Sequence, residues 1–412
     1  MVLSRKLVVT ASLVAALSCG GVAAALAGTQ VGSSILGVRA ADAAEAPAAA
    51  SSAQDGAKAA SAAAAGSAKA DKPASTIGSV GITASADTRT VTDSDGNEVV
   101  IPKEVTKVAP TIGAFAQITE ILTNGNGKIV AAAAKNISDD FRATLPDYDK
   151  TNPQNLDASN IENLIAAGCQ VVYGPSSAFS DEQKQQLQQA GIAFVSVSKM
   201  STVDQLCDAT LTIGQILGDT EYQRAQDFVS YWKAGIQTSQ DRLKDVADAD
   251  KPGCLELDYT GGQYATVNST DIFSEYLKAA GGINLAADYT AGKNGTALEV
   301  SAEQIVAWNP SVIFARQQEA ADQIMADPAL ANVDAVKNGK VYTVPTGLYM
   351  WSVRSGEGAM TTPWLDTILW PDQFSDIDMS QVVTDFYKTW YNADVTPEKV
   401  EEILTGQTNQ AR

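Results

Sequence analysis

Two arginines are the strongest candidates for binding a charged ligand. Arginine is scarce in this chain, and Arg316 and Arg354 each follow a short apolar run that predicts a strand. The planar guanidinium group can bind a carboxylate or a phosphate through two parallel hydrogen bonds. Because the chain carries a net charge of −19, positive groups in a crevice indicate an anionic ligand. The alternative is an ion pair with an acidic side chain such as Glu357.

Aromatic residues accompany these arginines. Tyr349 and Trp351 lie just before the second arginine, and Tyr259 and Tyr264 follow another predicted strand. Rings at strand ends can stack on a flat macrocycle or pack against catechol rings, and a tyrosine oxygen can also ligate ferric iron. The alternative is ordinary aromatic packing at the edge of a lobe.

The first half of the chain offers weaker candidates for the same ligand. Thr111, Ser176 and Lys135 all lie in loops that follow predicted strands, and Ser177 and Asn136 are their neighbours. Their polar side chains could orient a ligand, although none of them has a strong individual claim.

The chain contains no histidine. This excludes Ser-His-Asp and Cys-His catalysis as well as the His-rich sites typical of zinc and copper. It also removes the commonest proximal haem ligand. We therefore expect no enzyme, no cofactor and no protein-bound metal. A hydrolase with two carboxylates is the remaining enzymatic alternative, but no two acidic residues stand out as a pair.

The charge balance excludes two classes of partner. With a net charge of −19 and a pI near 4.4, the sequence has no basic stripe that could neutralise the phosphates of nucleic acid. It also lacks the clustered lysines and arginines needed to bind anionic lipid.

Residues 1–27 have the features of an export signal. Two basic residues precede an apolar stretch at 7–17, and small residues then lead to Cys19 as in a bacterial lipobox. Two alternatives remain, namely cleavage after Ala27 and an uncleaved anchor helix. All three interpretations of this segment predict export of the chain. We expect an extracytoplasmic, membrane-anchored lipoprotein.

Residues 28–86 are rich in alanine and serine and have almost no large apolar side chains. Such a segment cannot bury enough surface to offset the entropy of ordering, so it predicts a flexible tether.

Cys169, Cys207 and Cys254 remain if Cys19 carries lipid. Their spacing matches neither a disulfide framework nor a metal site, and we expect small buried side chains. A single bridge between Cys169 and Cys207 is an alternative in an oxidising compartment.

Residues 87–218 are predicted to form a first α/β lobe. Two short strands around a Ser-Asp-Gly-Asn turn occupy 89–102, and apolar runs that predict buried strands follow at 128–133, 170–173 and 193–197. Strands separated by helices indicate parallel βαβ units.

Residues 219–247 interrupt this alternation with a predicted inter-lobe helix. The segment contains no proline, and apolar side chains recur at helical spacing, as at Ala225, Phe228, Val229, Trp232 and Ile236. At about 1.5 Å per residue it could extend roughly 40 Å. Alternating strands and helices then resume in residues 248–412, which predict a second α/β lobe.

The two predicted lobes resemble each other in sequence. The segment beginning at Glu162 aligns with the one beginning at Glu303, an offset of 141 residues, and each predicts a helix followed by a buried strand. Ser159 and Ser301 stand upstream as predicted N-caps. The spacing is too long for a solenoid repeat and suits duplicated lobes.

Taken together in their order along the chain, several segments resemble those of the helical-hinge class of ABC-importer binding proteins. This class serves the uptake of iron–siderophore complexes, haem and cobalamin. The resemblance covers about residues 88–404 and is carried by the segments 90–102, 160–165, 300–310, 338–345 and 364–371. One departure is Gly168-Cys169, where the family commonly has Pro-Asp before the strand.

The resemblance implies two Rossmann-like lobes joined by a single long helix, with a ligand cleft between them. It also implies an ABC permease with its ATPase as partners, and docking of Glu162 and Glu303 onto permease arginines. We expect a monomer that captures a small-molecule metal complex. A ferric siderophore fits the arginines and aromatic residues best; cobalamin or another corrinoid, haem and an oxyanion such as molybdate are alternatives. A surface adhesin or sensor on the same scaffold is an alternative of another class.

Overall fold

The computed structural model describes residues 77–197, 200–290, 293–294 and 297–407. The predictions of a signal peptide and of lipidation at Cys19 lie outside the described residues, as does most of the predicted tether. The described residues all belong to one compact unit. No helix formed by the described residues combines the length and the apolarity needed to cross a bilayer.

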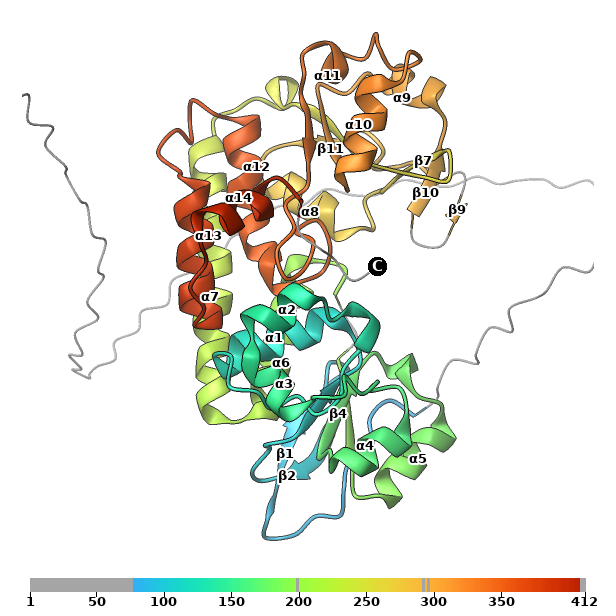
Figure 1. The fold of residues 1–412 in the computed structure, drawn as a ribbon, viewed down its shortest axis with the longest axis vertical. Coiled ribbons are helices and arrows are strands. Elements are labelled where there is room, and N and C mark those ends of the chain that lie inside the picture. Colours follow the sequence, from blue (N-terminus) through green and yellow to red (C-terminus); the bar gives the residue numbers. More distant parts are fainter. Residues whose placement is uncertain (1–76, 198–199, 291–292, 295–296, 408–412) are drawn as a thin grey trace, which may run out of the picture. The chain divides into compact units, whose positions relative to one another are not determined.

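The first lobe is built on a three-stranded parallel sheet (Figure 1). Its strands β3 (Val108–Pro110), β4 (Val171–Gly174) and β5 (Ala193–Ser196) are buried at every residue. The predicted strand at 128–133 forms only isolated bridges, such as Val108 with Ile129. A predicted hairpin is present as β1 (Thr88–Thr92) and β2 (Glu98–Pro102).

Six helices belong to the described part of this lobe: α1 (Gly113–Thr123), α2 (Asp139–Thr144), α3 (Pro146–Thr151), α4 (Ile161–Ala167), α5 (Asp181–Gln189) and α6 (Val203–Leu217). Short 3₁₀ turns lie at Ala134–Asn136 and Ser176–Ala178. The predicted N-cap of α4 is wrong by one residue, because Asn160 accepts the capping bond from Asn163 while Ser159 bonds to Asp157.

The folded body begins earlier than expected. Val80 pairs with Phe194 beside β5, and the Ser79 hydroxyl donates to Asp93 in the hairpin turn at 2.7 Å. The tether boundary predicted at residue 86 therefore lies too far along the chain. The apolar Val80 and Ile82, which pack on the cores, were the signal for this boundary.

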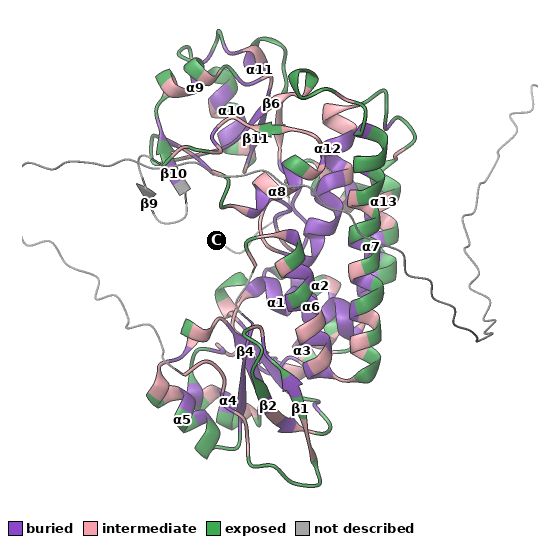
Figure 2. Ribbon diagram, turned by 180° about the vertical axis from the view of Figure 1, so that it is seen from behind, coloured by how far each residue is buried: buried purple, intermediate pink, exposed green. Residues whose placement is uncertain are grey.

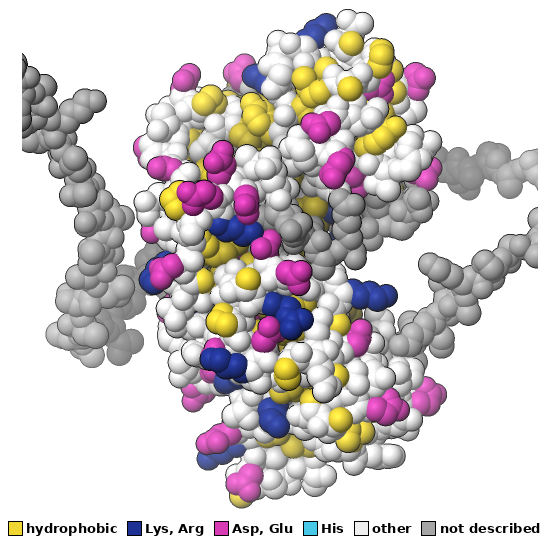
Figure 3. Space-filling model, viewed as in Figure 1, with side chains coloured by type: hydrophobic (Ala, Val, Ile, Leu, Met, Phe, Trp, Pro, Cys, Tyr) yellow, Lys and Arg dark blue, Asp and Glu magenta, His cyan; other side chains and the backbone are white. Residues whose placement is uncertain are grey.

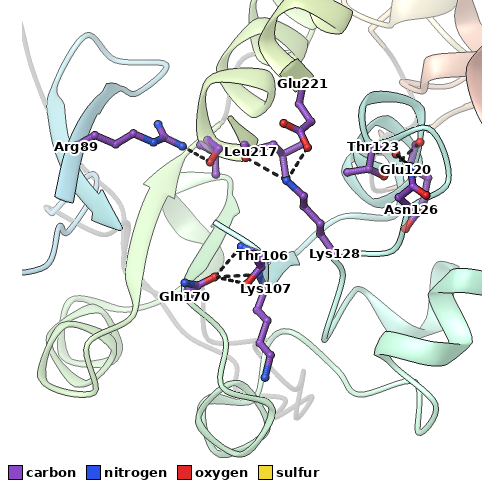
Figure 4. Close-up of polar contacts among 11 residues, drawn as sticks. Arg89, Thr106, Lys107, Glu120, Thr123, Asn126, Lys128, Gln170, Leu217 and Glu221 are labelled. Carbon is purple, nitrogen blue, oxygen red and sulfur yellow. Dashed lines mark hydrogen bonds and ion pairs between the residues drawn. The ribbon is translucent and has the colours of Figure 1, made fainter. Parts of the chain in front are cut away.

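The long helix α7 spans Asp219–Leu243 and ends four residues before the predicted limit at residue 247. Ala225, Phe228 and Trp232 are buried along one side, and Figure 2 shows the exposed residues of its outer face. Lys128 ties the start of α7 to the first lobe, because its ammonium pairs with Glu221 at 2.6 Å and donates to the Leu217 carbonyl (Figure 4).

The second lobe has a seven-stranded mixed sheet in the order β12-β11-β6-β7-β10-β9, with β8 beside β6. The parallel part of this sheet was predicted. The antiparallel part was not: β7 pairs antiparallel with β6, β10 with β7, and β9 with β10. The strands are β6 (Gly253–Thr260), β7 (Gln263–Thr266), β8 (Ile283–Asn284), β9 (Lys293–Asn294), β10 (Ala297–Val300), β11 (Val312–Ala315) and β12 (Val341–Thr343). The helices are α8 (Ile272–Ala279), α9 (Ala302–Trp308), α10 (Gln318–Ala326), α11 (Asp334–Lys337) and α12 (Thr361–Leu369).

The chain then returns beside α7 as α13 (Met379–Phe386) and the π-helical turn η5 (Tyr387–Tyr391), and α14 (Pro397–Leu404) follows and packs on α13. Arg224 of α7 connects this segment to the first lobe. Its guanidinium donates to the Ile121 carbonyl of α1 and to the Thr389 carbonyl, both at 2.6 Å, and lies over the Trp390 ring. The lobes are therefore joined by packed side chains as well as by α7, which favours a stiff hinge.

The three described cysteines are free and buried. The expectation of small buried side chains is confirmed, and the alternative of a bridge between Cys169 and Cys207 is wrong. On the face drawn in Figure 3, acidic and basic side chains are interspersed.

The buried carboxylate of Glu357 fixes the segment after β12. Glu357 lies in the 3₁₀ turn η4 (Gly356–Met360) and accepts bonds from the Leu348 amide at 3.1 Å, the Trp351 indole at 3.1 Å and the Tyr387 hydroxyl at 3.0 Å. Burial raises its pKa to about 7 against the effect of these bonds. The alternative of an ion pair between Glu357 and Arg354 is therefore wrong.

We expect Tyr387→Phe to destabilise the protein by about 1–3 kcal/mol, the range for leaving a buried polar group without its hydrogen-bond partner. The lost hydroxyl serves both Glu357 and the Leu348 amide, which donates to it at 3.2 Å. Urea unfolding at pH 7 measures the effect. Tyr231→Phe is the matched control, because Tyr231 is 37% exposed on α7 and should change stability by less than about 0.5 kcal/mol. Equal losses in the two variants would contradict the role given to Glu357.

Candidate functional site: a cleft lined by both lobes

Side chains from both lobes line a cleft of about 440 Å³. The first lobe supplies Ile112, Ala114, Asn136, Ser138 and Met200, and the second supplies Arg316, Leu348, Tyr349, Met350, Val353 and Arg354. The cleft lies beyond the carboxyl ends of β3 and β11, where open α/β sheets bind their ligands. Its volume falls within the range of about 300–1,000 Å³ for small-molecule sites.

Arg316 reaches the cleft directly from the end of β11. Its backbone amide donates to the Leu257 carbonyl of the neighbouring strand at 2.9 Å, which fixes where the side chain starts. The guanidinium lies 3.8 Å from the Glu256 carboxylate and donates to the Met350 sulfur at 3.8 Å. Glu256 raises the pKa of Arg316. The ion-pair alternative is thus realised here, although with Glu256 as the partner.

Arg354 is held by backbone from the opposite lobe. Its Nε donates to the Met200 carbonyl at 3.0 Å, and it forms no ion pair with any residue that the structure describes. Its charge is therefore not neutralised by a neighbouring carboxylate. Of the two arginines, Arg354 has the positive charge more readily available to a ligand.

Tyr349 closes the cleft against the first lobe at the start of α1. A side chain at Gly113 would meet the Tyr349 ring at 2.9 Å and the Asn136 Cβ at 2.5 Å, so this approach requires glycine. Burial raises the pKa of Tyr349, which keeps its hydroxyl protonated. The α1 N-terminus has no side-chain cap, and its dipole favours negative charge at this end of the cleft.

Three predicted aromatic ligand residues lie elsewhere. Trp351 is fully buried and bonded to Glu357, so it supports the loop behind Met350 and does not face the cleft. Tyr259 and Tyr264 pack on each other at 4.8 Å, and the Tyr264 hydroxyl donates to Asp327 at 2.7 Å. The ring-packing alternative therefore describes these two residues.

The weaker candidates of the first lobe lie beside the cleft residues. Thr111 precedes Ile112, and Lys135 precedes Asn136, but neither lines the cleft. Ser176 lies in the turn after β4, where its carbonyl accepts a bond from Lys184 at 2.7 Å.

The sequence did not single out Ser138, Met200, Val353 or Glu256. Glu256 had a recognisable signal, since it is a carboxylate between two leucines in the buried part of β6. Ser138 caps α2 by accepting from the Phe141 amide at 3.0 Å, and capping residues of this kind can be read from sequence.

Glu162 and Glu303 occupy equivalent exposed positions, each as the second residue of its helix, α4 or α9. Hydrogen bonds from its own backbone and from Ser301 lower the pKa of Glu303, so this carboxylate is charged at neutral pH.

The family model described as periplasmic binding protein matches residues 114–347, which is more than half of the chain. The molybdate-binding protein MolA of Haemophilus influenzae is 26% identical over 356 residues, covering 79% of this chain and 97% of MolA. The uncharacterized ABC transporter substrate-binding lipoprotein YvrC of Bacillus subtilis is 24% identical over 291 residues, which cover 70% of this chain and 87% of YvrC.

A periplasmic solute-binding protein from Veillonella parvula has a similar structure, with a TM-score of 0.64 and 22% identity over 77% of this chain and 97% of that one. This likeness agrees with the two-lobed α/β fold, which confirms the predicted fold class. The described contacts and the family match lead to one conclusion: the chain belongs to the periplasmic binding protein family and is an extracytoplasmic solute-binding protein of an ABC transporter.

Proposed function

We propose that the cleft captures an anionic metal complex, with a ferric siderophore as the best match, and delivers it to an ABC permease with its ATPase. The proposal rests on one observation: Arg354 lines the cleft and has no ion-pair partner among the described residues. Arg316 and the uncapped N-terminus of α1 add positive potential in the same space. Three positive groups from separate elements favour a ligand with negative charge.

The lining of the cleft also favours a complex over a bare metal ion. Apart from the two arginines, the lining is mostly apolar and includes Ile112, Leu348, Met350 and Val353. The described residues form no group of three or more acidic or cysteine side chains that could hold a metal. A metal in this cleft would therefore keep the donor atoms of its own chelator, while the apolar lining packs on the chelator's carbon skeleton.

Molybdate is the second candidate, and the similarity to a molybdate-binding protein favours it. Arginines and helix N-termini are suitable donors for an oxyanion. However, a cleft of 440 Å³ is far larger than a single tetrahedral oxyanion, so molybdate would require a smaller, more closed cleft or a larger complex that contains it.

We expect Arg354→Ala to weaken binding of an iron(III)–catecholate complex by about 1.5–3 kcal/mol. Arg354→Lys should recover only part of the loss, because an ammonium group cannot reproduce the guanidinium fork. Isothermal titration of each variant with the iron complex, with molybdate and with a neutral corrinoid gives the comparison.

Arg142→Ala is the matched control, since Arg142 pairs with Asp149 outside the cleft lining. It should bind like the unmodified protein. Tight binding of the corrinoid, equally strong in Arg354→Ala, would replace the siderophore proposal with the cobalamin alternative.

The surface around Glu162 and Glu303 supports permease docking. An exposed aliphatic side chain lies three residues after each glutamate: Ile165 is 52% exposed and Val306 is 40% exposed. Side chains three residues apart lie on the same helix face, so each lobe presents one carboxylate beside one apolar contact. Such a pair suits an arginine or lysine whose alkyl stem packs on the aliphatic group.

The double change Glu162→Ala and Glu303→Ala should leave ligand affinity intact and abolish ligand-dependent stimulation of the transporter ATPase. Truncating one partner of a buried charge pair costs about 2–5 kcal/mol, enough to prevent productive docking. Reconstituted permease and ATPase provide the assay.

Glu398→Ala is the control. Glu398 is likewise an exposed glutamate in the first turn of its helix, but the residue three positions later is the charged Glu401 and not an aliphatic side chain. Normal stimulation by the double variant would refute the docking role.

We also propose that Cys19 carries the lipid anchor, as the lipobox predicts. The description of YvrC as a lipoprotein supports this proposal.

A further inference from the structure

The Glu256 carboxylate lies directly beneath the ligand cleft. Its side chain is 1% exposed, whereas that of Arg316, which lines the cleft, is 25% exposed. The two charges are 3.8 Å apart, and neither Glu256 oxygen has a partner within hydrogen-bonding geometry among the described residues. Arg316 is therefore the main group that stabilises the charged form of Glu256.

The other surroundings of Glu256 disfavour its charge. Asp271 at the start of α8 and Asp258 on the same strand are both acidic and raise the pKa of Glu256, whereas Arg316 and, more weakly, the nearby Ser352 hydroxyl lower it. The void that Glu256 shares with Asp258, Thr266 and Arg316 has no room for a water molecule. Burial is the dominant effect and raises the pKa of Glu256 to about 7.

An anion on Arg316 would remove this stabilisation. It would bring a second negative charge to the guanidinium, so the ionised form of Glu256 would lose part of its main attraction. The carboxyl would then hold a proton at a pH where it is ionised in the empty protein. Proton uptake and anion binding must favour each other to the same extent, because linkage is reciprocal.

On the basis of the proposed function, we propose that Glu256 sets the charge selectivity of the cleft. Its carboxylate competes with the ligand for Arg316, and it takes up one proton when an anion binds. The cleft then accepts anions more readily at acidic pH than at alkaline pH. The sign follows from the raised pKa, because below about pH 6 Glu256 is already neutral and binding takes up no proton. Above pH 7 each anion bound should take up close to one proton.

Titration calorimetry in buffers of different ionisation enthalpy measures this uptake, with molybdate and an iron(III)–catecholate complex as probes. The affinity of the unmodified protein should fall by up to about tenfold per pH unit above pH 7. Glu256→Gln should bind with about tenfold higher affinity at pH 8. The proton uptake of the unmodified protein minus that of this variant isolates Glu256 from protons taken up by the ligand itself.

Asp258→Asn is the matched control and should keep most of the proton uptake, because Asp258 forms no ion pair with Arg316 and has the weakest of these effects on the pKa of Glu256. A ligand-induced infrared difference spectrum of the unmodified protein provides a second readout that does not depend on the variant folding. It should gain the carbonyl band of a protonated carboxyl at pH 8. Anion binding with equal proton uptake in the unmodified protein and Glu256→Gln would overturn the coupling and leave the proposed function standing. If neither anion binds at any pH, the proposed ligand class and the coupling are both wrong.

Discussion

The buried carboxylate of Glu357 is the constraint on which the ligand side of the second lobe depends. It accepts bonds from a backbone amide, an indole and a tyrosine hydroxyl that come from both ends of the cleft loop and from η5. Gly347 permits this arrangement, because a side chain there would meet the carboxylate at 2.3 Å. With these bonds in place, Tyr349, Met350 and Arg354 have few alternative positions, and the cleft is organised before any ligand arrives.

The two cleft arginines have different roles because their partners differ. Arg316 emerges from the sheet and balances a buried carboxylate, so a ligand must compete for it. Arg354 donates to a backbone carbonyl of the first lobe, and this bond spans the cleft without removing the positive charge. The bond also couples the position of Arg354 to the separation of the lobes. A change in that separation would therefore move a ligand-binding group.

The sequence predicts the fold well where burial is continuous. Val312–Ala315 is a strand at the predicted residues, because a strand covered on both faces is apolar throughout. The antiparallel half of the second sheet escaped prediction, although Gly261 and Gly262, both with positive φ, mark the turn between β6 and β7. The site was predictable only in part. The location of Arg316 in the cleft could be predicted, because the residue follows a strand. Its partner Glu256 could not, because it comes from another strand. The partner of Arg354 lies 154 residues away in the sequence. Trp351 was assigned to the ligand because sequence shows that a loop is aromatic and does not show which ring turns inward.

We propose above all that both arginines contact one anionic ligand in the cleft between the lobes. A crystal structure of the protein loaded with an iron or molybdenum complex tests this most directly, since anomalous scattering locates the metal. We predict a metal peak within the cleft, with ligand oxygens at hydrogen-bond distance from Arg316 and Arg354. A ligand bound outside the cleft, or in the cleft without contact to either guanidinium, would contradict it.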